Sequence, residues 1–259
     1  MTSKIAEAAL PLYSYPEEFL PESDGKPMAE TDLHRDQMVY LLDALKEYFQ
    51  DDSQVYVTGN IFLYYRDEAH VRQSVSPDIF VVRGVPKHER RIYNLDKELQ
   101  APQLVIELTS ATTKVEDLVT KRFIYKSLGV REYFLFDPYC ETMQPALAGY
   151  RLQNGDYSPM LGTRMHSEEL QLDLVVEDGF LRLYDQKTGD RLPTREELQA
   201  ARRKAQAEAQ AVRKMAARAA KAQQAAEAKA AQESAARRAA EEELARLREE
   251  VAKQRDKQE

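Results

Sequence analysis

The chain has 259 residues and a formal net charge of −7, which suffices for one folded core and an appendage. Residues 1–193 carry 21 basic and 32 acidic side chains, whereas residues 194–259 carry 16 basic and 12 acidic ones. An acidic body excludes broad electrostatic binding of nucleic acid, so any DNA contact has to be local or bridged by cations. The single cysteine excludes an internal disulfide and predicts a cytoplasmic protein. No stretch reaches the ~20 apolar residues of a membrane span.

The N-terminal part of the body predicts an irregular segment, then a helix and several strands. Recurrent prolines mark residues 1–21 as irregular. Apolar side chains at helical spacing predict a helix over about residues 34–49. Runs of apolar and aromatic residues predict four strands, over residues 55–57, 61–65, 79–82 and 104–108. The sequence between the last two strands predicts a long polar loop over residues 84–101.

The rest of the body continues the alternation of helix and strand. Thr113 and Glu116 match a capping box, which predicts a helix that ends at Gly129. The apolar run over residues 132–136 predicts the next strand. Two turn-forming pairs predict hairpins further along, Asn154-Gly155 and Asp178-Gly179. This order of elements predicts an α/β fold, in which helices flank a mixed sheet.

Residues 194–259 differ from the body in composition. Alanine, arginine, lysine, glutamate and glutamine dominate, and the segment has no aromatic residue, glycine or proline. This composition predicts one long helix. A loose heptad runs from Leu198 through Val212 and Met215 and drifts by Leu244, so a coiled coil and a solvated single helix both fit.

Three charged side chains point to chemistry because the predicted fold brings them near one another. Asp78 begins one predicted strand, Glu107 interrupts the apolar run of another, and Lys121 lies on the helix that follows. Two carboxylates on neighbouring strands can hold a hard cation such as Mg²⁺ through oxygen. A nearby lysine can orient water or stabilise a charged transition state. This combination is typical of a metal-dependent phosphodiesterase.

Each residue also has a structural interpretation. Asp78 fits a turn, and Glu107 fits an edge strand. Asp117 and Lys121 fit an exposed ion pair, which would stabilise the helix only slightly. His34 is interpreted as a residue that opens the first helix. Basic residues of the polar loop fit either phosphate contacts or a solvated surface, namely Lys87, Arg90 and Arg91.

The sequence resembles the Uma-type family of bacterial restriction-endonuclease-like proteins, which is placed in the PD-(D/E)xK nuclease superfamily. The resemblance covers about residues 22–193, and residues 107–138 are its most specific part. The matching motifs are Glu30 to His34, Ser76-Pro77-Asp78, Ile106 to Ser110, Glu116-Asp117-Leu118 with Lys121 and Tyr125, and Gly129 to Pro138.

The resemblance implies roles for five residues. Asp78 and Glu107 become metal-binding carboxylates, with the backbone carbonyl near Leu108 or Thr109 as a further ligand and Glu30 as an additional acidic residue. The superfamily lysine is expected two positions after the glutamate, where this chain has Thr109. In the family a lysine from the next helix replaces it, and Lys121 matches that position.

Two functions follow as hypotheses. The first is a Mg²⁺-dependent endonuclease, with Mn²⁺ as a substitute ion, that hydrolyses DNA phosphodiesters through Asp78, Glu107 and Lys121. The second is a non-catalytic interaction protein with a nuclease-like body in residues 1–193, which works through the helical tail of residues 194–259. In either case the tail is a candidate for forming a homo-oligomer.

Overall fold

The computed structural model describes residues 20–22, 31–110 and 116–255, and the chain divides into two compact units, Met1–Arg195 and Glu196–Glu259. The first unit is built on a six-stranded mixed sheet with the order β1-β4-β6-β7-β8-β9. Only β6 and β7 run parallel, and the other neighbours are antiparallel. The six strands are β1 (Val55–Thr58), β4 (Ile79–Arg83), β6 (Leu104–Leu108), β7 (Glu132–Phe136), β8 (Leu147–Gln153) and β9 (Asp156–Met160).

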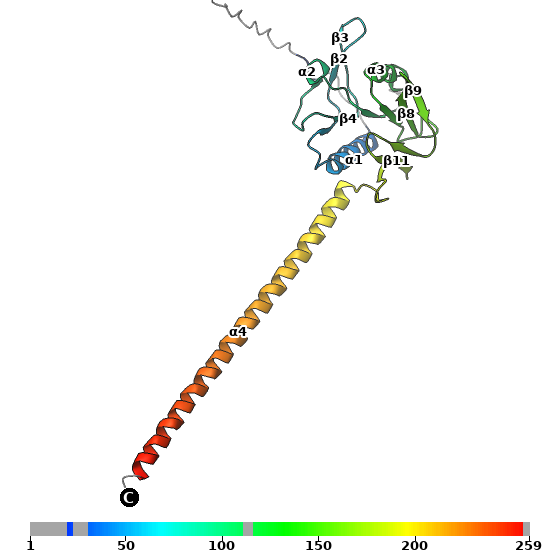
Figure 1. The fold of residues 1–259 in the computed structure, drawn as a ribbon. Coiled ribbons are helices and arrows are strands. Elements are labelled where there is room, and N and C mark those ends of the chain that lie inside the picture. Colours follow the sequence, from blue (N-terminus) through cyan, green and yellow to red (C-terminus); the bar gives the residue numbers. More distant parts are fainter. Residues whose placement is uncertain (1–19, 23–30, 111–115, 256–259) are drawn as a thin grey trace, which may run out of the picture. The chain divides into compact units, whose positions relative to one another are not determined.

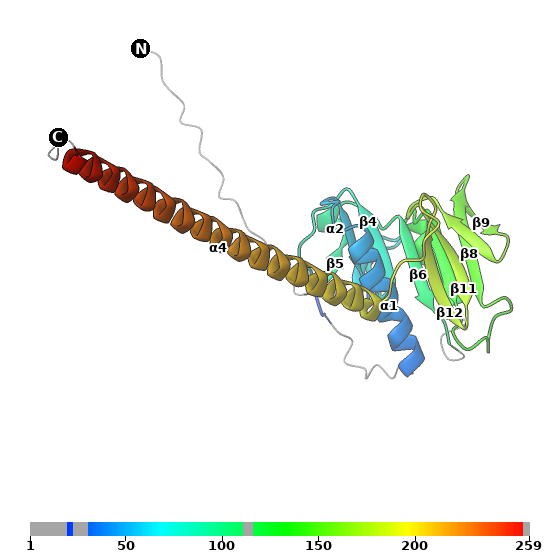
Figure 2. The ribbon, with the colours of Figure 1, turned by 90° about the horizontal axis from the view of Figure 1, so that it is seen from below.

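One face of this sheet packs against helix α1 (Asp32–Tyr48) and a small antiparallel sheet. That sheet consists of β10 (Arg164–Ser167), β11 (Leu172–Glu177) and β12 (Phe180–Asp185). Ile79, Ile106 and Phe134 point to this side and share one apolar cluster with Leu41 and Leu181. Figure 2 shows α1 together with β11 and β12. The predicted α/β fold with a mixed sheet and flanking helices is therefore confirmed.

The opposite face packs against a second small sheet and a helix. The second sheet has the order β3-β2-β5, from β2 (Leu63–Arg66), β3 (Arg72–Val75) and β5 (Tyr93–Asn94). Phe80, Val105 and Leu135 point to this side and cluster with Tyr93 and Tyr125. Alternate residues of each central strand thus serve two separate cores, as the period of a strand requires. Figure 1 shows β2 and β3 on the other side of β4 from α1.

Helix α1 begins two residues earlier than the sequence predicted. Thr31 is its N-cap, and the side-chain oxygen of Thr31 accepts a hydrogen bond from the backbone N–H of His34. Gln37 is fully buried, and its amide exchanges two 3.0 Å hydrogen bonds with the backbone of Leu181. This pair joins α1 to β12, a contact that periodicity cannot predict because glutamine is usually exposed.

The polar stretches of the N-terminal half contain more structure than was predicted. Strand β3 was not predicted, because two of its four side chains are exposed and polar, and it forms a hairpin with β2. Residues 84–101, predicted to be a loop, include β5 and the one-turn helix α2 (Leu95–Glu98). Asn94 caps α2 by accepting from the N–H of Asp96. The prediction of an uninterrupted loop was wrong because pairing with β2, a long-range contact, orders β5.

The helix between β6 and β7 begins as a π-helix. The π segment η1 (Glu116–Lys121) leads into α3 (Arg122–Ser127), and Gly129, with φ of +77°, follows the helix as predicted. The predicted cap at Thr113 lies outside the described residues. π-helical turns are rare and occur often at functional sites, and a regular α-helix had been predicted here.

The two predicted hairpin turns are present. Asn154 and Gly155 have φ of 52° and 82° between β8 and β9, and Asp178 and Gly179 have φ of 51° and 78° between β11 and β12. Two successive positive φ values are those of a type I′ turn, whose twist matches that of the paired strands.

The second unit is the continuous helix α4 (Arg195–Arg255) of 61 residues, seen as one rod in Figure 1. The side chains of residues 199–248 are exposed. Side-chain pairs four residues apart lie along it, such as Arg237 with Glu241 at 3.0 Å. Among the described residues, no helix combines the length and hydropathy needed to cross a membrane.

Candidate metal and catalytic site

Asp78 and Glu107 lie opposite each other on neighbouring strands. The antiparallel ladder pairs Ile79 with Ile106 and Phe80 with Val105, and the same register places Asp78 across from Glu107. The backbone N–H of Asp78 donates to Glu107 Oε2 at 3.4 Å. In return, the N–H of Leu108 donates to Asp78 Oδ2 at 2.7 Å.

Both carboxylates belong to the face of the sheet that α3 covers. Glu107 alternates with Ile106 and Leu108, which point to the α1 side, so Glu107 shares the α3 side with Val105. All five side chains of β6 are buried, and Glu107 has no exposed surface. The edge-strand interpretation of Glu107 is therefore wrong, because β6 lies between β4 and β7.

The helix after β6 supplies two donors to the Glu107 carboxylate. Lys121 Nζ lies 2.9 Å from Oε2, and the Tyr125 hydroxyl donates to Oε1 at 2.5 Å. Lys121 is the last residue of η1 and Tyr125 lies one turn further in α3. The structure thus brings Asp78, Glu107 and Lys121 together. It also adds Tyr125, which the sequence placed on this helix face without a role.

Tyr125 remains a hydrogen-bond donor over the whole working pH range. Burial raises the pKa of the Tyr125 hydroxyl well above its usual value, and the charge and hydrogen bond of Glu107 raise it further. The hydroxyl therefore keeps its proton at neutral pH. It fixes one oxygen of Glu107 while the other faces Lys121 and the backbone of Asp78.

His34 lies at the edge of the same site. Its Nε2 is 3.9 Å from Asp78 Oδ1, and both side chains are 15% exposed. His34 occupies the first turn of α1, as interpreted from the sequence. The structure adds its proximity to a carboxylate, which the sequence could not reveal because the two residues lie 44 positions apart.

Gly59 allows the chain to pass close to Asp78. A Cβ atom on Gly59 would lie 1.8 Å from the backbone carbonyl oxygen of Asp78, a distance that no side chain can occupy. The next residue, Asn60, has φ of 56° and donates its N–H to the carbonyl of Pro77. The loop after β1 therefore supports the first residue of β4, and only glycine fits at this contact.

The donor set fits a hard divalent cation. Asp78 and Glu107 provide carboxylate oxygens at adjacent positions on one face, which is the ligand chemistry that Mg²⁺ prefers. Thr109 lies on the same face, two residues after Glu107, and its buried hydroxyl has no hydrogen-bond partner in the part of the chain that the structure describes. Such an atom leaves room for a bound water or ligand. Among the described residues, no group of three His, Cys, Asp or Glu side chains converges on one point.

Two further residues of the sequence hypothesis fall outside this description. Glu30, the candidate additional acidic residue, precedes the described segment that begins at residue 31. The side chain of Asp117, one of the two partners in the expected helix ion pair, is likewise not described. Lys121, the other partner, contacts Glu107 instead.

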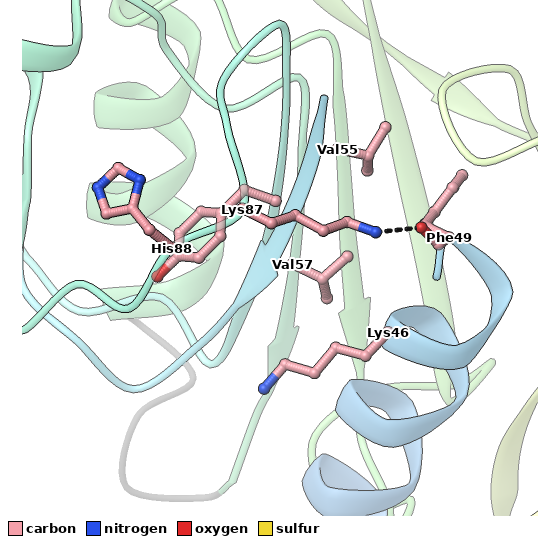
Figure 3. A pocket seen from close by; sticks show the side chains of 7 residues that line it. Lys46, Phe49, Val55, Val57, Lys87 and His88 are labelled. Atoms are coloured by element: carbon pink, nitrogen blue, oxygen red, sulfur yellow. Dashed lines mark hydrogen bonds between the residues drawn. The ribbon is translucent and has the colours of Figure 1, made fainter. Parts of the chain in front are cut away.

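The basic residues of the 84–101 segment make contacts within the protein. Lys87 Nζ donates to the backbone carbonyls of Phe49 and Gln50 at the end of α1, where a cation complements the helix dipole. Arg90 pairs with Glu98 at 2.7 Å, and Arg91 pairs with Glu22. Lys87 also borders an apolar pocket of about 310 Å³ beside β1, drawn in Figure 3. None of the residues that line this pocket contributes to the Asp78–Glu107 site.

Comparisons with known proteins agree with this site. The model of the Uma2 family, described as "Putative restriction endonuclease", matches residues 9–182. The chain is also similar to the crystal structure of "a putative nuclease belonging to DUF820" from Anabaena variabilis ATCC 29413, at 19% identity and a TM-score of 0.46, over 62% of this chain and 93% of that chain. No curated protein matches the sequence. Because the family match spans more than half of the chain, the protein belongs to the Uma2 family.

Proposed function

We propose that the protein is a nuclease that hydrolyses DNA phosphodiester bonds with the help of a divalent cation, Mg²⁺ or, as a substitute, Mn²⁺. The observation that carries this proposal is the pairing of Asp78 and Glu107 across two strands, with Lys121 Nζ 2.9 Å from Glu107 Oε2. Membership of a family described by restriction endonucleases supports the same activity. The single cysteine suits a reducing cytoplasm.

Asp78 and Glu107 would hold the cation, together with the backbone carbonyl of Leu108, and Glu30 is a candidate to join them. When bound, the cation would neutralise phosphate charge and lower the pKa of water. Tyr125 and the backbone N–H of Asp78 hold the Glu107 carboxylate in a fixed orientation. The N–H of Leu108 does the same for Asp78. Fixed ligands of this kind bind a metal more tightly than mobile ones.

Lys121 would act on water and phosphate rather than on the cation. Its side chain is 14% exposed, so the ammonium can face a substrate while Glu107 orients it. A positive charge held in place without bulk water stabilises the additional negative charge of the transition state. Thr109 cannot take this role, although it stands where the superfamily lysine is expected, because a hydroxyl carries no charge.

The proposal is tested by a cleavage assay on single-stranded, duplex and branched DNA, with Mg²⁺, Mn²⁺ or EDTA. We expect cleavage in the presence of either ion and none with EDTA. Calorimetric titration of Mn²⁺ into the wild type and into the Asp78→Ala and Glu107→Ala variants locates the ion. Unchanged affinity in both variants would show that the carboxylates do not bind it, and the non-catalytic interaction protein would then be the better description.

The second unit suggests a second function, self-association. In α4, four large apolar side chains are at least half exposed, namely Val212, Met215, Leu244 and Leu247. Burial of such side chains against another helix is favourable. We therefore propose that α4 joins copies of the protein into a homo-oligomer, which light scattering on the full-length and truncated chains would detect.

A further inference from the structure

Two ten-residue segments of α4 have complementary properties. The basic segment, residues 209–218, has three basic and no acidic side chains, and it contains Val212 and Met215. The acidic segment, residues 241–250, has five acidic and two basic side chains, and it contains Leu244 and Leu247. Each segment therefore combines two large apolar residues, three positions apart, with a net charge opposite to that of the other segment.

The apolar pairs form two small patches on a helix that is otherwise polar or alanine-rich. Val212 and Met215 are 66% and 74% exposed, and Leu244 and Leu247 are 50% and 55% exposed. Residues three apart lie on one side of a helix, so each pair presents a single apolar surface. Between the segments, twelve of the 22 residues are alanine. Because alanine buries little area, the two end segments decide how this helix pairs.

We propose that α4 pairs with α4 of a second copy of this chain in antiparallel orientation. The basic segment of each helix lies against the acidic segment of the other. In this register Val212 lies beside Leu247 of the second copy, and Met215 lies beside Leu244. The pairing is centred between Lys229 and Ala230. One alignment thus brings together both the apolar pairs and the opposite charges.

Charge decides between the two possible orientations. A parallel pair would place the basic segment against itself and the acidic segment against itself, and like charges along a helix interface are unfavourable. The antiparallel pair places three positive charges opposite a net excess of three negative ones. Glu241 already pairs with Arg237 of its own helix at 3.0 Å. An exposed pair of this kind is worth little and can exchange partners.

This inference rests on the self-association proposed for α4 and does not depend on phosphodiester cleavage. Sedimentation of the full-length wild type measures association itself, and we expect a dimer. A monomer at all accessible concentrations would overturn the proposal, whatever the nuclease assay shows. Retention of the dimer with a changed interface is then tested by the variants below.

Cross-linking reports the orientation directly. Two full-length variants, Val212→Cys and Leu247→Cys, are prepared on a Cys140→Ser background, mixed and mildly oxidised. The antiparallel register predicts a mixed disulfide between the two variants, identified by mass. Disulfides that form within each variant alone, and not between them, would mean a parallel pair and would overturn the inference.

Charge reversal tests the complementarity. One triple variant reverses the basic segment and a second reverses the acidic segment; they are Arg213→Glu, Lys214→Glu, Arg218→Glu and Glu241→Lys, Glu242→Lys, Glu243→Lys. Each variant alone is expected to dimerise at least about tenfold more weakly, and an equimolar mixture should recover wild-type affinity. A matched control reverses three basic residues outside the segment, Arg202→Glu, Arg203→Glu and Lys204→Glu, and should keep the dimer. Failure of the mixture to recover would contradict the proposed register.

Discussion

Two buried glutamates on neighbouring parallel strands show how differently the same side chain can be used. Glu107 lies near the end of β6 and Glu132 is the first residue of β7, and they are 0% and 1% exposed. A buried carboxylate is costly unless it is paired or bound to a metal. Both glutamates meet this requirement, but with different kinds of partner.

Glu132 is surrounded by hydrogen-bond donors. Oε1 accepts from Arg151 at 2.9 Å and from the N–H of Glu168, and Oε2 accepts from the Ser167 hydroxyl and the N–H of Glu169. These contacts join β7 to β8 and to the end of β10. The partners compensate the charge and leave no need for a cation, so the residue stabilises the fold.

Glu107 faces a second carboxylate, Asp78, in addition to its donors Lys121 and Tyr125. Two adjacent carboxylates repel each other unless a cation lies between them or beside them. The comparison shows that burial of a carboxylate does not identify a functional site by itself. A carboxylate that faces another one, beside a lysine that can reach substrate, does indicate a site.

The largest expected effect comes from Lys121→Met. Because the ammonium acts on developing charge, cleavage should fall by about 10²–10³-fold, while Mn²⁺ affinity stays nearly the same. Single-turnover cleavage and calorimetry measure the two quantities separately. Lys126→Met is the matched control, since Lys126 lies on the same helix and pairs with Asp156 instead. Normal cleavage by Lys121→Met together with loss in Lys126→Met would identify a different lysine.

Much of this site could be predicted because its main residues are short-range signals. An acid inside an apolar strand, such as Glu107, and a lysine on the next helix can be recognised from their neighbours in sequence. Tyr125 was visible on the correct helix face, but its hydrogen bond to Glu107 depends on the π-helical entry to α3. Periodicity predicts regular helices and cannot specify such a turn.

Contacts between distant segments escaped prediction in the fold as well. The exchange of hydrogen bonds between Gln37 and Leu181, and the network around Glu132, join elements far apart in sequence. Strand β5 forms because it pairs with β2, whereas its own two residues carry almost no signal. By contrast, the turns at Asn154-Gly155 and Asp178-Gly179 were predictable, because positive φ depends on the local residue types.

Gly59→Ala tests the support of the site from its backbone side. The added methyl group cannot fit beside the Asp78 carbonyl, so β1 or β4 must move. We expect a loss of about 2 kcal/mol in the free energy of unfolding and weaker Mn²⁺ binding. Gly84→Ala is a useful control, because no atom lies within 4 Å of the added Cβ, although its φ of +83° adds local strain. Equal effects on Mn²⁺ affinity in the two variants would argue against a specific role of Gly59.

Tyr125→Phe removes one donor from Glu107 and leaves the aromatic core in place. Mn²⁺ affinity should fall by about tenfold, the effect expected of a partner that orients a metal ligand. Tyr157→Phe is the matched control, since Tyr157 stacks in the same aromatic cluster but donates to the carbonyl of Val130. If both variants lower Mn²⁺ affinity equally, the effect comes from the core and not from the Glu107 hydrogen bond.

Asp137 extends the comparison to a third buried carboxylate, which resembles Glu132 in its partners. Burial acts to raise its pKa, but hydrogen bonds from Thr142, Met143 and Tyr139 outweigh burial and lower the pKa. A lowered folded-state pKa contributes stability above the unfolded value of about 4, and this stability is lost as pH falls through the folded value. Asp137→Asn should therefore cost about 1 kcal/mol at neutral pH, and the difference from wild type should shrink below about pH 4. A difference that is independent of pH in chemical denaturation would exclude this role.

The most direct test of the account compares Glu107→Gln with Glu132→Gln, by DNA cleavage with Mg²⁺ and by thermal unfolding without metal. Glu107→Gln should abolish cleavage and keep or raise the melting temperature, because it removes repulsion with Asp78. Glu132→Gln should lower the melting temperature and retain cleavage per folded molecule, because its partners serve only the fold. Wild-type cleavage by Glu107→Gln, or a folded but inactive Glu132→Gln, would contradict the assignment of the site.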